Sequence, residues 1–247
     1  MKFNTRLLVL PLLAAIPFAY SAEQPDYYDY GFIGGSLVYG ESVYRQQDEN
    51  AGFSLEPNLF YNGKYGFVDG SLANLTLFHP WFGLSGQWRF AEVSQDFDEI
   101  PSGIDERKGN GELGITFGTV GARITYLHDV TDVHNGYEVQ LHLSRSYTTA
   151  LPKLTLTPYV EADYRDSKLS QHLYSVSPTE ATRSRLPAFT AKSTWVYQAG
   201  LIGIYDLGDN WISIAKVELE HHDSASPILQ RDLGWAVTLG AAYTFNF

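Results

Sequence analysis

The sequence predicts an all-β fold, a transmembrane antiparallel β-barrel of the outer membrane, and three observations support that prediction. Apolar and polar residues alternate with a period of two along segments of roughly ten residues. Aromatic residues lie at or near the ends of the apolar faces. The connections between the segments are alternately short and long, as expected when turns lie in the periplasm and loops lie outside the cell.

Composition excludes several other classes of protein. The 247 residues carry a net charge of −11, so the chain lacks the basic surface that a nucleic-acid-binding protein needs. It has no cysteine, which excludes disulfides, thiolate metal sites and a cysteine nucleophile. After the first residues, no apolar run is long enough for a membrane-spanning helix of about 20 residues.

Residues 1–21 have the order of a cleaved signal peptide. Lys2 and Arg6 form a basic start, residues 7–18 are apolar, and Ala19-Tyr20-Ser21 fits a small-x-small cleavage site. The apolar run is too short for the alternative, a membrane anchor. We therefore expect residues 22–247 to form a single β-barrel domain, exported to the cell outer membrane.

Eleven segments are candidate strands. Seven alternate clearly, at 81–91, 111–117, 120–126, 137–143, 154–164, 211–221 and 235–247. Four are weaker, at 31–40, 53–61, 65–77 and 195–205. A single-chain barrel needs an even number of strands, and Asp69-Gly70 predicts a hairpin inside 64–79. Twelve strands are therefore predicted, with ten also possible.

Two features separate this barrel from a soluble sandwich or lipocalin-like barrel, which also alternate. The predicted outer faces hold large aliphatic and aromatic residues, while the opposite faces hold Glu, Arg, Gln and Gly. Long connections also fall on one side. The longest, 165–193, is polar and contains Pro178 and Pro187. We expect this segment to be irregular and to form either an extracellular loop or a constriction folded into the lumen.

The alternation places nine charged residues on the lumen face, with a net charge of minus three. Two interpretations remain open: a pore wall that favours cations, or a salt-bridged plug that fills a narrow barrel. The predicted lumen-facing charges are Arg89, Glu112, Arg123, Glu138, Glu161, Asp163, Lys216, Glu218 and Glu220.

Residues that could carry catalysis or bind metal are few. His221-His222-Asp223, followed by Ser224 and Ser226, could supply a base, a nucleophile or metal ligands. Adjacent residues at a strand end point in different directions, so we expect a polar rim there. The acidic segment with Asp96, Asp98, Glu99, Asp105 and Glu106 lacks EF-hand spacing, which favours a solvated loop over a Ca²⁺ site. We expect no catalytic residue, no cofactor and no metal.

Two resemblances follow from particular residues. The ending Tyr243, Phe245, Phe247 resembles the terminal pattern of outer-membrane proteins, which implies recognition by the barrel-assembly machinery.

Five groups of residues resemble motifs of the MipA/OmpV family, the MltA-interacting outer-membrane proteins, over most of the mature chain. These are Pro57 with Tyr61, Phe67-Val68, Asp129-Val130 with His134-Asn135-Gly136, Asp163-Tyr164 with Tyr174-Ser175-Val176-Ser177 and Glu180-Ala181, and Ser226-Pro227-Ile228 with Ala242-Tyr243-Thr244-Phe245. Ser175 and residues 42–46 depart from the family pattern.

The family resemblance implies an outer-membrane barrel in contact with membrane lipid. It also implies a scaffold that links a lytic transglycosylase to a penicillin-binding protein in peptidoglycan assembly. The short periplasmic turns offer such partners little surface. A small-solute channel and a surface-loop adhesin or receptor therefore remain as alternatives.

The first residues should be absent from the mature protein. Because residues 1–21 have the order of a signal peptide, the chain purified from envelopes should begin at Ala22 or Glu23. Intact-mass measurement checks this start. A mass that corresponds to a chain beginning at Met1 would show that the segment is retained.

Overall fold

The computed structural model describes residues 29–45, 51–78, 81–92 and 101–246. The predicted signal segment, most of the predicted acidic loop and Phe247 lie outside these residues. Within them, a single antiparallel sheet contains thirteen strands. The strands are β1 (Tyr30–Glu41), β2 (Gly52–Gly63), β3 (Gly66–Asp69), β4 (Leu72–Phe78), β5 (Phe82–Arg89), β6 (Asn110–Thr119), β7 (Ala122–Asp129), β8 (Tyr137–Ser144), β9 (Tyr147–Thr148), β10 (Leu154–Arg165), β11 (Thr194–Gly208), β12 (Trp211–His222) and β13 (Gly234–Asn246).

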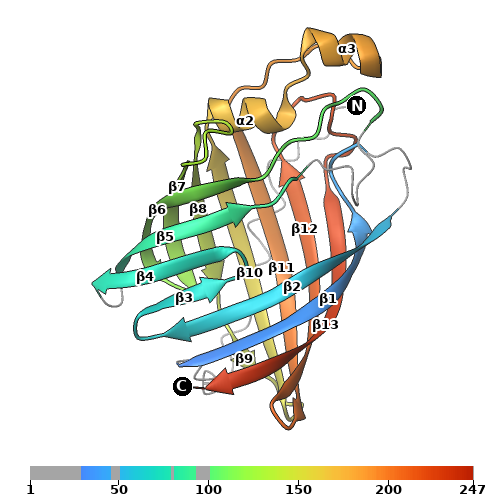
Figure 1. Cartoon of the computed structure of the whole chain (residues 1–247). Helices are drawn as coiled ribbons and strands as arrows, with labels where there is room; N and C mark the ends of the chain where they lie inside the picture. Colours follow the sequence, from blue (N-terminus) through green and yellow to red (C-terminus); the bar gives the residue numbers. More distant parts are fainter. Residues whose placement is uncertain (1–28, 46–50, 79–80, 93–100, 247) are drawn as a thin grey trace.

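The sheet closes on itself as a twelve-stranded barrel, which confirms the predicted fold class and strand number (Figure 1). The two-residue strand β9 pairs with β10 just beyond β8, so β8 and β9 form one interrupted strand. Closure comes from two pairings: β10 with β11, and the first strand with the last. In the latter, Tyr30 lies opposite Asn246 and Glu41 lies opposite Trp235.

The additional strand that the hairpin signal predicted within 64–79 is present, because this segment forms two short strands, β3 and β4. β3 and β4 form a tight hairpin in which Asp69 pairs with Leu72. Gly70 occupies its turn with a φ of 59°, a conformation that favours glycine. The hairpin is shorter than its neighbours, so it fills only part of the wall between β2 and β5.

The prediction that 165–193 is irregular was wrong. This segment contains α2 (Ser167–Tyr174) and α3 (Pro178–Ser184), which lie over one end of the barrel (Figure 1). The Asp166 side chain accepts the Leu169 N–H and begins α2. Ser177 and Glu180 form a reciprocal capping box at the start of α3. Neither described helix is long and apolar enough to cross a membrane.

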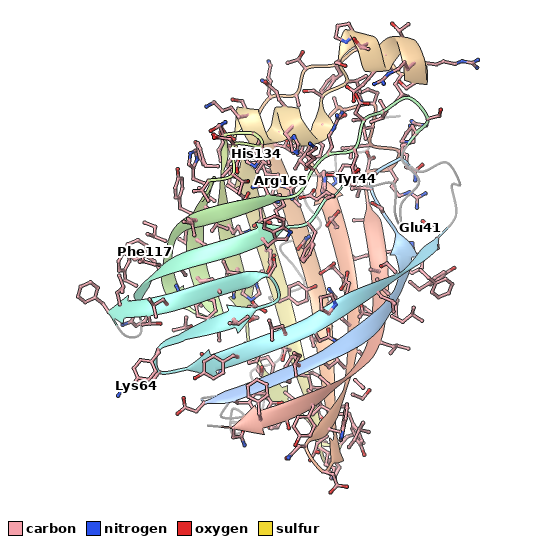
Figure 2. All side chains as sticks on the ribbon, viewed as in Figure 1. Glu41, Tyr44, Lys64, Phe117, His134 and Arg165 are labelled. Carbon is pink, nitrogen blue, oxygen red and sulfur yellow. The ribbon has the colours of Figure 1, made fainter. Side chains whose placement is uncertain are left out.

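The outer surface of the barrel is apolar and its inner surface is largely polar. Phe117, labelled in Figure 2, points outward and is 55% exposed, as are many large apolar residues of other strands. Inside, Ser85, Thr116 and Thr125 form a chain of hydroxyl hydrogen bonds of 2.6 and 2.9 Å across β5, β6 and β7. An apolar exterior around satisfied interior groups suits a barrel in lipid.

The connections give the barrel its orientation. Both described ends of the chain lie at the end of the barrel that carries the short turns, including 64–65, 120–121 and 209–210 (Figure 1). The helices and the long connections lie at the other end. In outer-membrane barrels the short turns are periplasmic. The α2 end therefore faces outside the cell.

A charge on the lipid face should cost much more than one facing inward. Leu141 of β8 points outward, and we expect Leu141→Arg to destabilise the barrel by roughly 2–4 kcal/mol near the membrane midplane. The neighbouring His142 points inward and bonds to Glu161, so His142→Arg should cost far less. Urea unfolding in lipid vesicles measures both. Equal losses would contradict the inside–outside assignment.

Candidate functional site

The extracellular end of the barrel is covered by a small hydrophobic core. α2 contributes Leu169, Leu173 and Tyr174, which are almost fully buried. They pack against residues from the β1–β2, β5–β6 and β12–β13 connections and from the chain segments on either side of α3. Those partners are Val43, Tyr44, Ile104, Val176, Ala191 and Ile228.

Three local contacts fix this cover in place. Asp166 accepts the backbone N–H of Tyr137 at 3.1 Å, which ties the start of α2 to β8. Ser226 donates its hydroxyl to the Tyr174 carbonyl at 2.5 Å, which ties the end of α2 to the last long loop. Val176 forms a β-bridge with Phe189. The cover is therefore bonded to the barrel on several sides.

Directly beneath the cover, two buried arginines and three glutamates form an ion-pair network. Arg89 of β5 donates to Glu112 of β6 at 3.0 Å and to Glu92 at 2.9 Å, and it also contacts Glu138 of β8. Arg165 of β10 donates to Glu138 at 3.0 Å and to Glu92 at 2.8 Å. β5 and β10 are not neighbours in the sheet, so these bonds cross the lumen.

Aromatic and histidine side chains join the network to the cover. Tyr44 donates to Glu92 at 2.7 Å, and the Tyr174 hydroxyl lies 3.1 Å from Nδ1 of His222. Nε2 of His222 in turn lies 2.9 Å from a carboxylate oxygen of Glu220. Figure 2 shows Tyr44, His134 and Arg165 gathered at this end. We use the name mouth network for the following residues: Arg89, Arg165, Glu92, Glu112, Glu138, Tyr44, Tyr174, His134 and His222.

Electrostatics keeps the mouth network ionised. Burial alone would raise the pKa of Glu92, but Arg165 and Arg89 lower that pKa well below its usual range. Burial also raises the pKa of Tyr44 and of Tyr174, so both phenols stay protonated and able to donate. The described groups therefore form a network of paired charges that crosses the lumen.

Of the remaining predicted lumen charges, Glu220 contacts the network through His222, and the others have partners of their own or lie elsewhere in the lumen. Arg123 of β7 bonds to Asp69 of β3 at 2.7 Å. Glu161 contacts His142, and Asp163 is buried with one carboxylate oxygen lacking a partner among the described residues. Lys216 lies 3.5 Å from Glu218, which also accepts a hydrogen bond from Tyr159. Gln198 donates to Glu220 at 2.8 Å.

Apolar side chains fill part of the periplasmic end of the lumen, which the alternation did not predict. Ile212 and Ile214 of β12 are buried inside the barrel beside Ala242 of β13. Phe32 and Ile202 pack against them. On the other side of the barrel, Phe67, Leu72 and Leu127 form a second apolar cluster. The interior is thus packed at several levels rather than uniformly polar.

Sequence reasoning missed the residues that link the network. Glu92 lies just after β5, outside any alternating segment, and Tyr44 lies in a loop. Arg165 was assigned to the loop 165–193, although extending the alternation from Glu161 and Asp163 puts it on the same face. Nothing in the sequence places Tyr174 beside Arg165, because α2 first has to fold over the mouth.

Two of the three predicted assembly residues, Tyr243 and Phe245, lie on β13. Tyr243 faces outward and is 42% exposed. The Phe245 ring covers Gly31 of β1, where a Cβ would lie only 2.4 Å from that ring. The small residue at Gly31 thus permits close contact between the first and last strands. Phe247 lies outside the described residues, so its role stays a prediction.

The His221-His222 pair and its neighbours do not converge on one point. His222 is buried inside the barrel, whereas His221 faces outward beside Tyr197. Ser226 is engaged with the Tyr174 carbonyl. No group of three or more His, Cys, Asp or Glu residues suited to a metal ion occurs in the described ranges.

Motifs that resemble family patterns meet at the extracellular end. The Asp129 carboxylate accepts backbone N–H groups from Thr131, His134 and Asn135 at 2.7–2.9 Å and so folds the loop after β7. Glu180 pairs with Arg107 at 2.8 Å, which joins α3 to the loop before β6. These motifs build the extracellular cover.

Comparison with known proteins gives one match to a family. The model of the family described as MltA-interacting protein MipA matches residues 33–245. The chain is 28% identical to YiaT of Escherichia coli (strain K12), over 94% of this chain and 96% of YiaT. YiaT is named, provisionally, as an outer membrane protein. YiaT of Escherichia coli O157:H7 gives the same values.

Two solved structures have a slight overall likeness. The outer-membrane channel DcaP of Acinetobacter baumannii is 9% identical with a TM-score of 0.32, covering 87% of this chain and 96% of that channel. The CymD monoaromatic hydrocarbon channel is 10% identical with a TM-score of 0.34, covering 88% of each chain. At these TM-scores the likeness carries no functional implication.

Removing one carboxylate from the mouth network should be costly. Glu92→Gln removes the carboxylate that pairs with both buried guanidiniums, and we expect a loss of about 3 kcal/mol in unfolding free energy. Asp105→Asn is the control, because the exposed Asp105–Arg183 pair should contribute about 0–1 kcal/mol. Urea unfolding in lipid vesicles measures both variants.

The same experiment has a definite pH dependence. Because the folded pKa of Glu92 is lowered, its contribution is fully present above the ordinary carboxyl pKa and is lost as the pH falls below it. The difference in unfolding free energy between the wild type and Glu92→Gln should therefore persist at pH 7 and become smaller in strong acid. A gap that widens in acid would contradict this role of Glu92.

Proposed function

The chain belongs to the MipA family, and from that premise we propose that it is an outer-membrane scaffold for peptidoglycan assembly. In this role its periplasmic end holds a lytic transglycosylase of the MltA type close to a penicillin-binding protein. The coarser assignment, an outer-membrane β-barrel of this family, stands without the proposal.

The observation that best supports a scaffold over a channel is the sealed lumen. The mouth network spans the extracellular end with paired, buried charges. The cluster around Ile212 and Ile214 fills part of the periplasmic end. Breaking buried ion pairs is expensive, so a barrel closed in this way is a poor open pore. Its remaining surfaces suit contact with other molecules.

The periplasmic rim offers apolar side chains to a partner. Tyr65, Trp81 and Leu151 lie in or beside short turns and are each 64–72% exposed. Lys64 lies at the same rim (Figure 2). Some of these residues also suit the aromatic girdle at the membrane boundary. A partner that contacts the rim would cover them without long periplasmic loops.

A small-solute channel is the second candidate, because the middle of the lumen is acidic. Glu56, Glu161 and Glu218 lie there with Lys216 as the nearest lysine partner. Such a wall would favour cations if the two closed ends opened. The adhesin alternative would use the exposed helices of the extracellular cover.

Affinity capture from cross-linked, solubilised envelopes tests the scaffold. We expect murein hydrolase and synthase to co-purify with the wild type. Tyr65→Ser combined with Leu151→Ser at the rim should lower their recovery about fivefold, since apolar anchors dominate such contacts. The control is Thr182→Ala combined with Arg183→Ser in α3, at the other end. Equal recovery with both variants would argue against the rim.

Planar-bilayer recording separates the scaffold from the channel. We expect the wild-type protein to show no stepwise conductance, because paired charges cross its extracellular end and apolar side chains narrow its periplasmic end. Steady conductance with a preference for cations would support the second candidate instead. A heat-modifiable gel shift of the same sample verifies that the barrel is folded.

A further inference from the structure

The upper half of β2 lies at a break in the barrel wall. β2 pairs with β1 from Gly52 to Asn62, but its pairing with β3 runs only from Phe60 to Gly63. The last backbone hydrogen bond on this side of β2 runs from the Gly70 N–H to the Leu59 carbonyl. Within the described parts of the chain, residues 52–59 therefore have no strand partner on the β3 side.

The sequence of β2 fits an edge strand at this place. Pro57 lies in the middle of the unpaired stretch, opposite Gly35 of β1. Proline has no N–H to give to a neighbouring strand, so within sheets it is confined to edges, strand starts and bulges. A complete wall here would need a donor at Pro57. The edge is thus unpaired for two reasons: Pro57 has no N–H to donate, and the β3–β4 hairpin is too short to reach it.

Side-chain exposure shows that the break reaches the lumen. Glu56 lies opposite Ser36, which is buried inside the barrel, so Glu56 belongs to the inward face of β2. It is nevertheless exposed, unlike the inward-facing residues of the complete wall such as Thr125. On the outward face, Leu55 and Phe53 are 74% and 64% exposed. Both faces of this strand are therefore open along one edge.

A cavity of about 190 Å³ lies directly behind the upper part of β2. Glu218 and Glu220 of β12 line it together with Phe53 and Trp235. None of the described residues that line it is a lysine or an arginine, although Lys216 lies 3.5 Å from Glu218 and Nε2 of His222 lies 2.9 Å from Glu220. Glu41, also in the lining, is already paired with Arg231.

A buried polar group without a partner lies on the same wall. Thr238 is 2% exposed, and its hydroxyl has no partner among the described residues. It faces inward on β13, two residues beyond Ala236, and pairs with Val38 in the sheet. Ala236 and Val38 both line the cavity. An unsatisfied hydroxyl at this position is a ready contact for a molecule in the cavity.

We propose that the break between β2 and the β3–β5 wall is a lateral entrance, through which a small amphiphilic organic cation passes from the membrane into this cavity. Glu56 lies at the entrance and Glu218 and Glu220 lie inside, so the path favours positive charge. Leu55 and Phe53 lie on its lipid side, so the path also accepts an apolar tail. The rings of Phe53, Tyr39 and Trp235 contact one another on the outer face and add apolar surface at the lipid side.

The lateral path is independent of the scaffold proposal, because it uses neither the periplasmic rim nor an axial pore. It also leaves the mouth network intact. A sealed mouth and a side entrance are compatible, since the molecule would arrive from the outer leaflet rather than from the extracellular solution.

Cysteine labelling tests the entrance, because the natural chain has no cysteine. Ser54→Cys puts a thiol on the inward face of β2 beside the break, where Ser54 lines the cavity. Thr125→Cys is the matched control, an inward hydroxyl position on β7 in the complete wall. The proteins are reconstituted in lipid vesicles and treated with a long-chain alkyl maleimide that resides in the bilayer.

We expect Ser54→Cys to react about tenfold faster than Thr125→Cys, since only the former has a path to the lipid. Octyltrimethylammonium, as the probe cation, should slow this reaction, whereas octanol should not. Adding Glu218→Gln and Glu220→Gln should abolish the protection and keep the fast labelling.

Three results would overturn the proposal. Equal rates for the two thiols would mean that the wall is closed to lipid. Protection that survives the double glutamine substitution would mean that the acidic side chains do not hold the cation. A slow Ser54→Cys together with a cross-linked dimer would mean that a second copy of the chain pairs with the β2 edge. Heat-modifiable migration verifies that each variant is folded.

Discussion

The structure depends on the need of every backbone N–H and C=O for a partner in a medium without water. In hydrocarbon an unpaired peptide group costs several kcal/mol, so a sheet that crosses the membrane has to close. The pairings of β1 with β13 and of β10 with β11 provide that closure. The close packing of Phe245 on Gly31, the outward apolar faces and the short periplasmic turns all follow from the closed ring.

Closure creates an interior that the chain then has to fill. Arg89 and Arg165 are almost fully buried inside the barrel, and each pairs with at least two carboxylates. Desolvated charges are tolerated only with such complete pairing, so the mouth network rigidly joins β5, β6, β8 and β10. α2 then covers the network with apolar residues and excludes solvent. Paired charges and the cover thus stabilise each other.

The same principle makes the upper part of β2 unusual. A sheet edge inside a membrane would be costly, yet Pro57 removes one donor from that edge. The β3–β4 hairpin stops short of this part of the wall, and an acidic cavity lies behind it. The paired charges at the mouth and the unpaired edge of β2 therefore lie in the same extracellular half of the lumen, the first across its axis and the second in its side wall. The periplasmic rim, with its short turns, stays free for contacts with other proteins.

The alternation in the sequence predicted the barrel, twelve strands with ten also possible, and the inward or outward face of each clear strand, because a period of two depends only on neighbouring residues. It also predicted the hairpin at Asp69-Gly70. It did not determine α2 and α3, although Ser177-Pro178-Thr179-Glu180 carries a capping box, because a polar segment with two prolines resembles a loop. Only the tertiary structure decided that Glu92, Arg165, Tyr44 and Tyr174 meet, that isoleucines fill the periplasmic end, and that β2 is left partly unpaired. These features arise between residues far apart in the chain, and their contacts exist only after the ring has closed.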